Sequence, residues 1–327
     1  MKPLPPEILM HIAEAVVDQD AVAFPAHHAI TRTLFSFLTV SQAASNIARS
    51  LLLAHCLYID SDQRLKALIR CLEANGIRDH LDRRAKSIQK LFLKPFTSNT
   101  INERSVVDDI YTLFHIVGPV LRKVVVDIPF RSYYPDEDRD TQIRPVMRDG
   151  FERLHNVEEF ISVNDELYLD TLVGVREDLV WTHWSKLRYL ALYNLEISLS
   201  DRASPKALVE LPELEIVILA RPDWDRDGIQ ELYRNVRKPT HIAFLNTPFE
   251  HNMDFDEENT PDPATRSLTP TRETVELKGT SCQMLHFHKI DVDPGDPSTS
   301  TFAHNPKEKC QRFLRERGLD RSLWRLL

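Results

Sequence analysis

Glycine is scarce in this chain, with only 8 among 327 residues. The closest pair, Gly279 and Gly295, lies 16 positions apart. A P-loop, a dinucleotide fingerprint and a nucleophile elbow each need glycines within about five positions, because the backbone must approach a phosphate or turn sharply there. The sequence therefore excludes all three of these sites, and we predict no cofactor.

Cysteine is equally scarce, and positive charge is in deficit. The chain has 4 cysteines, none in a C-x-x-C pair, and so few in this length are not a disulfide framework. We therefore expect a reducing compartment and a cytoplasmic or nuclear location. The 49 acidic and 41 basic residues give a formal net charge of −8, which argues against nucleic-acid binding.

Long hydrophobic runs are also lacking. The longest uncharged run, residues 33–48, contains several polar residues and is shorter than the ~20 that span a bilayer. The apolar stretch at residues 8–17 is interrupted by His11 and Glu14, which is unlike a signal peptide. We therefore expect no membrane segment.

Two motifs match metal sites only in part. Asp223-x-Asp225-x-Asp227-Gly228 is the first half of a calcium loop, but Arg234 stands where a bidentate glutamate is needed. His286-x-His288 places two imidazoles on one face of an expected strand, with no third ligand at a recognised zinc spacing. His27-His28 lies in a loop and is interpreted as structural. We predict no metal site.

Catalytic residues are not predicted either, because serine, histidine and aspartate stand in no recognised nucleophile context. A triad assembled in space is the alternative, and it needs a deep pocket with converging groups of perturbed pKa. A basic cluster without interleaved aromatics predicts a solvated helix face. Its members are Arg78, Arg83, Arg84, Lys86 and Lys90.

The first 76 residues are predicted to be helical. Pro6 suits the first turn of a helix, and residues 8, 9, 12 and 16 form an apolar stripe with helical spacing. Residues 34–47 and 51–59 indicate further helical segments. Asp60-Ser61-Asp62 can cap the next helix, which Asn75-Gly76 is expected to end.

A pattern of the form apolar-x-x-apolar-x-apolar recurs in the middle of the chain. Its copies begin 33, 36, 30 and 27 residues apart, with helical patterns between them. A strand followed by a helix about every 30 residues is typical of a leucine-rich-repeat-like solenoid. A non-repetitive α/β domain is the alternative. The copies are Ile88/Leu91/Leu93, Leu121/Val124/Val126, Val157/Phe160/Ser162, Leu187/Leu190/Leu192 and Leu214/Val217/Leu219, and residues 241–245 are a further candidate.

After the repeats the chain becomes acidic and rich in proline. Residues 247–280 have few apolar side chains to offset ordering entropy, so we expect a mobile segment there. Residues 284–292 predict a last strand. Asn305-Pro306-Lys307-Glu308 is a capping box that starts a helix with Gly318 as its stop, and residues 323–326 are expected to fold back on the last repeat as an end cap. Three tryptophans are expected to pack inside the repeats, namely Trp181, Trp184 and Trp224. The alternative is that they anchor a bound partner.

The opening Leu4-Pro5-Pro6-Glu7-Ile8-Leu9-x-x-Ile12 resembles the start of an F-box. Phe37-Leu38-Thr39-Val40-Ser41 resembles the second signature of that family, an apolar run that ends in valine-serine. Residues 49–60, 165–170 and 187–194 are similar to filamentous-fungal F-box proteins. The tryptophan that usually follows valine-serine in the family has no counterpart here.

This resemblance implies a non-enzymatic substrate-recognition subunit of an SCF-type (cullin–RING) E3 ubiquitin ligase. Its F-box would bind a Skp-type adaptor, and its repeats would bind a protein substrate that the sequence does not name. A scaffold that has lost adaptor binding, and whose first helix packs on the repeats, is the alternative. The adaptor contacts implied by the motif match are Leu4, Pro5, Ile8, Leu9, Ile12, Leu38 and Val40.

The expected fold class is α/β, in five parts. Residues 1–60 form an F-box-like helical domain and residues 61–86 a connecting helix. Residues 87–246 form an irregular leucine-rich-repeat-like solenoid, residues 247–280 the acidic proline-rich segment, and residues 281–327 the last strand with the C-terminal capping helix.

Overall fold

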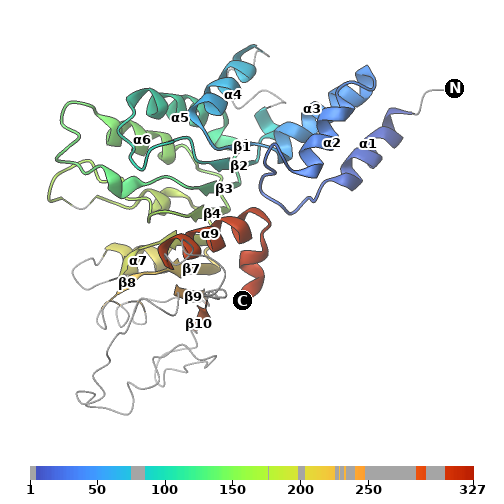
Figure 1. The fold of residues 1–327 in the computed structure, drawn as a ribbon. Coiled ribbons are helices and arrows are strands. Elements are labelled where there is room, and N and C mark those ends of the chain that lie inside the picture. Colours follow the sequence, from blue (N-terminus) through green and yellow to red (C-terminus); the bar gives the residue numbers. More distant parts are fainter. Residues whose placement is uncertain are drawn as a thin grey trace, which may run out of the picture.

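The computed structural model describes residues 5–74, 85–175, 177–197, 203–224, 240–246, 285–291 and 306–327, with Gly228 and Leu232. Within these residues the chain is an α/β protein with a parallel sheet (Figure 1). Its α-helices are α1 (Pro6–Val16), α2 (Ala29–Phe37), α3 (Gln42–His55), α4 (Asp62–Ala74), α5 (Arg104–Val117), α6 (Ile143–Glu152), α7 (Ala203–Glu210) and α9 (Pro306–Leu319).

The main sheet has eight strands, and every described pairing in it is parallel. They follow one another across the sheet in chain order as β1 (Tyr58–Ile59), β2 (Lys90–Leu93), β3 (Lys123–Val126), β4 (Glu159–Ser162), β5 (Tyr189–Tyr193), β7 (Ile216–Ala220), β9 (Thr240–Asn246) and β10 (Leu285–Asp291). A separate pair joins β6 (Glu196–Ile197) to β8 (Asp223–Trp224).

The recurring sequence pattern coincides with these strands. The middle apolar residue of each copy lies in register with that of its neighbour, and together they form one buried row on what we call the first face. The residues one position later form a second row on the opposite, second face. The first row is Leu91, Val124, Phe160, Leu190, Val217 and Ile242, and the second is Phe92, Val125, Ile161, Ala191, Ile218 and Ala243.

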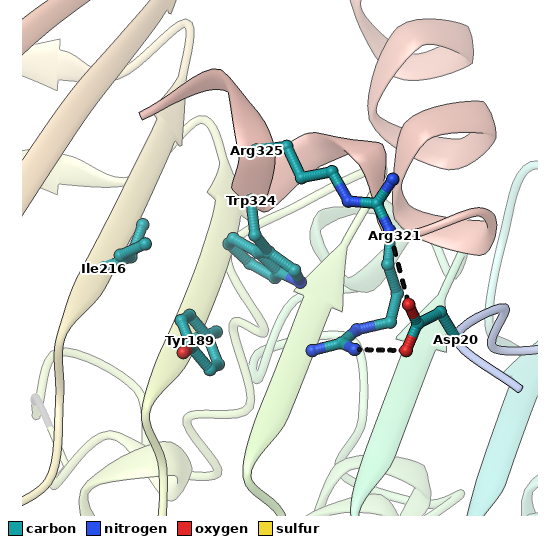
Figure 2. Close-up of a pocket in the computed structure, with 6 residues that line it drawn as sticks. All are labelled: Asp20, Tyr189, Ile216, Arg321, Trp324 and Arg325. Atoms are coloured by element: carbon teal, nitrogen blue, oxygen red, sulfur yellow. Dashed lines mark hydrogen bonds and ion pairs between the residues drawn. The ribbon is translucent and has the colours of Figure 1, made fainter.

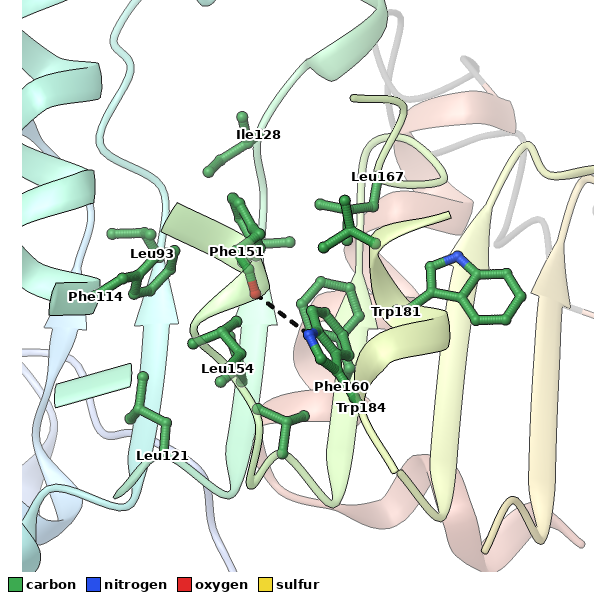
Figure 3. Packing of buried hydrophobic residues seen from close by; sticks show 14 of the residues in the cluster. Leu93, Phe114, Leu121, Ile128, Phe151, Leu154, Phe160, Leu167, Trp181 and Trp184 are labelled. Atoms are coloured by element: carbon green, nitrogen blue, oxygen red, sulfur yellow. Dashed lines mark hydrogen bonds between the residues drawn. The ribbon is translucent and has the colours of Figure 1, made fainter. Parts of the chain in front are cut away.

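The first face is covered by α4, α5, α6 and α7, whose apolar sides join it in one core. Two fully buried tryptophans, Trp181 and Trp184, lie in this core (Figure 3). Trp184 Nε1 donates to the Phe151 carbonyl at 3.2 Å, and the Phe151 ring meets Phe160 edge-on. The expected packing role of both tryptophans is confirmed. The side chain of Trp224 lies outside the described part of the chain.

The second face is covered by the last residues of the chain, which corrects the expected end cap. Helix α9 and the 3₁₀ turn η6 (Ser322–Leu326) contact the middle strands: Gln311 Nε2 donates to Asn164 Oδ1 at 2.8 Å, and the Tyr189 and Trp324 rings lie 5.5 Å apart. Figure 1 shows α9 over the middle of the sheet. Parallel sheets are buried on both faces. The amphipathic helix α9 therefore covers the second face of the sheet and does not cap the last repeat.

The N-terminal helices differ from the prediction in their boundaries. The chain breaks between α2 and α3 because the Ser41 hydroxyl accepts from the Ala44 N–H at 3.2 Å and starts a new helix. His28 caps α2 in the same way, with Nδ1 accepting from the Ile30 N–H at 3.3 Å, which is the structural role expected for it. The expected helix over residues 51–59 ends at His55, and Tyr58–Ile59 instead pairs with β2.

Residues 18–24, here called the strap, run from the helical bundle to the second face. The Val22 N–H donates to the Leu319 carbonyl at 2.7 Å, and Lys90 Nζ donates to the Ala21 carbonyl at 2.9 Å. Lys90 therefore lies in β2, half-buried under the strap, and its expected place on a solvated helix face is wrong. Lys90 contacts backbone carbonyl groups of the strap, which any sequence provides, so the amino-acid sequence alone does not reveal this contact.

Several predictions concern parts that the structure does not describe. These are the stop at Asn75-Gly76, the cluster members Arg78, Arg83 and Arg84, the acidic segment over residues 247–280 and the capping residue Asn305. The strand predicted at residues 284–292 is present as β10. Among the described helices, none combines the length and the apolar character needed to cross a bilayer.

Candidate functional site

Helix α1 has two apolar sides. Its inner side consists of the half-buried Leu9 and the buried Ala13, at a spacing of four residues, followed by the buried Val17 just after the helix. On the outer side Ile8 and Ile12 are each 45% exposed and Val16 is 37% exposed. Side chains four apart lie one above the other on a helix, so these three form a continuous stripe, here called the α1 stripe. Single exposed apolar residues are common on proteins, whereas an aligned set marks a docking surface.

The helical bundle has a small core of its own, to which α1 contributes through Val17 just after its end. Val17, Ala21, Phe24 and Leu34 form a small separate core, on which α3 packs through Leu51 and Leu52. This core does not include the α1 stripe, so the bundle is closed without it. The α1 stripe is therefore left over for contacts outside the described chain.

The α2–α3 junction adds two more exposed apolar side chains, Phe35 at 51% and Val40 at 67%. Val40 lies in the turn that Ser41 ends, which keeps the side chain out of both helices. Four of the residues singled out by motif match are exposed, namely Pro5 just before α1, Ile8, Ile12 and Val40. Leu9 and Leu38 are half-buried, and Leu4 lies outside the described residues.

A network of buried charges lies at the carboxyl ends of β3 and β4, the edge where α/β enzymes place their active sites. Arg144 is fully buried and donates to the backbone carbonyls of Phe130, Tyr133, Tyr168 and Asp170. It thereby ties the loops after β3 and β4 together. Because all these acceptors are backbone oxygens, the guanidinium serves the fold.

The acidic members of this network are also engaged. Arg131 forms a bidentate ion pair with the buried Glu166, and the Arg131 N–H donates to Asp165 Oδ2 at 3.1 Å. Burial raises the pKa of Asp165 to about 6, with the Arg131 N–H acting in the opposite direction. The two acidic oxygens of Asp138 accept from the first N–H groups of α6, at 2.7 and 2.8 Å from Ile143 and Arg144. The arrangement stabilises loops and a helix start.

Metal ligands do not converge anywhere in the described residues, where no group of three histidine, cysteine or acidic side chains is placed to hold an ion. Asp223 is exposed at β8, and Asp225 and Asp227 lie outside the described residues. His286 and His288 are on β10, as predicted, but their side chains are not described.

A second exposed apolar surface escaped the sequence analysis. The loop after β4 presents Leu172, Val173 and Val175 to solvent at 53%, 60% and 53%, around Gly174 with φ +69°. We call these three side chains the apolar loop. Three apolar residues interrupted by a single glycine, between polar neighbours, were the available signal.

The base of the apolar loop is fixed although its tip is exposed. Glu177 accepts from both the N–H and the hydroxyl of Thr171, closing the loop, and the Arg148 guanidinium donates to the Asp178 carbonyl at 2.6 Å. Arg144 holds the preceding carbonyl of Asp170. A loop held in this way loses little further entropy when a partner binds its tip.

Comparison with known proteins gives no match to a family model, no significant match to a curated protein and no significant match to a solved structure.

Proposed function

We propose that the chain is a non-enzymatic substrate-recognition subunit of an SCF-type E3 ubiquitin ligase. In this proposal α1, α2 and α3 form the F-box and bind a Skp-type adaptor, which joins the chain to the cullin scaffold. The observation that carries the proposal is the α1 stripe. Its residues Ile8 and Ile12 belong to the F-box-like motif, and both are exposed while the bundle is closed without them.

The repeat region is proposed to be a leucine-rich-repeat-like solenoid. Its support is the strand order, in which each strand lies beside the next one in the chain and the pattern residues form one row. Stacking of neighbouring units in chain order is what distinguishes solenoids. The helical covering of the second face by α9 is a departure from a simple solenoid.

We place the protein substrate at the apolar loop. This surface lies on the repeat region and is independent of the α1 stripe in the fold, so both partners can bind at once. Holding a substrate beside a charged ubiquitin carrier raises its effective concentration, and the chain needs no catalytic residue for this. The proposal places the protein in the cytosol or the nucleus.

The test is co-purification of the full chain with a fungal Skp-type adaptor. The variant Ile8→Asp/Ile12→Asp puts charge into the α1 stripe, and a central interface residue contributes about 2–4 kcal/mol, so we expect at least about a 30-fold loss of affinity. The matched control is Met10→Asp, which is 41% exposed on the same helix but faces away from the stripe. It is expected to bind like wild type, and circular dichroism checks that both variants are folded.

Absence of a wild-type complex would overturn the adaptor proposal. So would equal binding by Ile8→Asp/Ile12→Asp and Met10→Asp. In either case the alternative, a non-catalytic interaction scaffold, would be favoured, and the apolar loop would remain its exposed docking surface.

A further inference from the structure

A small hollow lies where the strap, the middle strands and the end of the chain meet. It has a volume of about 220 Å³, below the roughly 300–1,000 Å³ of pockets that hold drug-sized ligands, so its size suits a small ligand. Two aromatic rings and two guanidinium groups line it (Figure 2). The lining residues are Asp20, Tyr189, Ile216, Arg321, Trp324 and Arg325.

The hollow contains a buried donor that has no acceptor among the described residues. Trp324 is only 8% exposed, and its Nε1 has no hydrogen-bond partner there. Figure 2 shows this nitrogen on the side of the ring that faces Asp20 and Arg321. Leaving a buried N–H unpaired is unfavourable, because the group has lost its water without a replacement. An acceptor that reaches this N–H from the hollow, after a small shift of the ring or of a neighbouring side chain, would remove this penalty.

Cations gather around the hollow, although the chain as a whole is acidic. Arg321 and Arg325 each contact Asp20 at 3.3 Å, and Arg321 also pairs with Glu159. Lys123 shares Glu159 at 3.4 Å. Lys90 lies behind the strap, and burial, followed by the charges of Lys123 and Arg321, lowers its pKa to about 8.

The local charge is therefore unbalanced. Four cations, namely Lys90, Lys123, Arg321 and Arg325, lie near three carboxylates, namely Asp18, Asp20 and Glu159. Of these groups Asp20, Arg321 and Arg325 line the hollow itself, so two guanidinium groups share one carboxylate there. Arg325 is the least committed of the four, because it is 70% exposed and its described ion pair is a single contact at 3.3 Å. Arg188 is balanced by Glu215 at 2.7 Å beside Tyr189 and adds no net charge.

We propose that this hollow binds a small oxoanion, a phosphate or carboxylate group. Its oxygens accept from Trp324 Nε1 and from the Arg325 guanidinium, while Asp20 keeps its contact with Arg321. Charge-assisted bonds of this kind are stronger than neutral ones, and arginine suits both groups because its donors match their oxygens. The Tyr189 ring and Ile216 leave room for an apolar body attached to the anion. The inference does not depend on adaptor binding.

The test is isothermal titration of the full chain with inorganic phosphate, and separately with acetate, against sodium chloride at the same ionic strength. We expect wild type to bind at least one of the two oxoanions and to show a higher melting temperature in its presence. Arg325→Gln removes an exposed donor without disturbing the fold, and we expect at least a tenfold loss of affinity. The matched control is Arg312→Gln on α9, which is 69% exposed and does not line the hollow.

Two further variants separate the roles of the lining groups. Trp324→Phe keeps a ring but removes the N–H, and we expect weaker binding. Asp20→Asn removes the competing carboxylate, and we expect binding to tighten several-fold. The proposal is overturned if neither oxoanion binds wild type more strongly than chloride does, or if Arg325→Gln and Arg312→Gln bind alike.

Discussion

His55, at the end of α3, is a buried imidazole held in its neutral form. Its Nδ1 lies 3.5 Å from Lys90 Nζ. Burial, followed by the charge of Lys90, lowers the pKa of His55 to about 4, with Asp18 acting in the opposite direction. Protonation of this ring would place two cations together under the strap, so the folded state resists it.

The resulting pH dependence can be isolated with His55→Gln. Between pH ~4 and ~6.5 the unfolded imidazole binds a proton that the folded one does not, so the stability of wild type rises with pH over this range and is lost as pH falls through it. Asp165, whose raised pKa gives a slope of opposite sign below about 6, is present in both proteins and cancels in the difference. In urea unfolding across this range, the slope of stability against pH should be less positive for His55→Gln than for wild type, and parallel slopes would contradict the prediction.

Single-residue roles were predictable only where they are local. The structural role expected for His28 is a cap that acts within two residues, and the burial of Trp181 and Trp184 follows from their place beside apolar strands. The Ser41 cap is equally local, but it was missed because the predicted helix over residues 34–47 ran through it. Lys90 was misplaced because its partners, the carbonyls of the strap, are about 70 residues away in the sequence. A cluster of basic residues predicts a surface in contact with solvent. It does not show that a distant segment of the chain covers one of these residues.

At the scale of elements, α9 approaches the sheet at Gly318. A Cβ at this position would lie 2.6 Å from Ile161 Cδ1, so the glycine allows the helix to lie close to β4. The helix ends one residue later, and Arg321 takes the left-handed conformation with φ 60°. The predicted stop at Gly318 is thus correct to within one residue, while the glycine has a packing role that the sequence did not indicate.

A double-mutant cycle tests this contact. Gly318→Ala alone is expected to destabilise the fold, because the new methyl group meets Ile161, and Ile161→Val alone should lower stability by about 0.5–1.5 kcal/mol. The loss of stability in the double variant should be smaller than the sum of the two single losses by at least about 0.5 kcal/mol. Valine leaves space for the new methyl group, and alanine favours the helix. Urea denaturation measures all three; additive effects would mean that the two side chains do not meet.

The strands were predictable from their sequence pattern, but the position of α9 was not. Each copy of the pattern buries residues on both faces, which indicates a sheet covered twice. The pattern of an amphipathic helix shows that one side of it packs on an apolar surface. It does not show which surface, and both the last repeat and the second face are apolar. The α1 stripe raises the same ambiguity, since spacing alone did not tell its outer side from its inner one.

On the scale of the whole molecule, the second face depends on the last 22 residues, 306–327. A chain that ends at residue 305 would expose the second row of the sheet, including Val125, Ile161 and Ile218. It would also lose the Leu319 and Arg321 contacts of the strap.

We therefore expect this truncated chain to aggregate or to lose cooperative unfolding, measured by size-exclusion chromatography and urea denaturation. Addition of the peptide 306–327 in trans is the control, and it should restore a cooperative transition. A truncated chain that stays monomeric and unfolds like wild type would show that α9 contributes little to the fold.

The contact between the Val22 N–H and the Leu319 carbonyl joins residues that leave the ribosome almost a whole chain apart. The strands can pair in order as they emerge, since each neighbours the next in sequence. The part of the second face that α9 and η6 cover nevertheless stays exposed until residues 306–327 have been made, and such surfaces are prone to aggregation. Synthesis of this protein thus includes an interval in which most of the described sheet is made and the strap is the only described segment on that side, and chaperones that bind apolar strands would act within it.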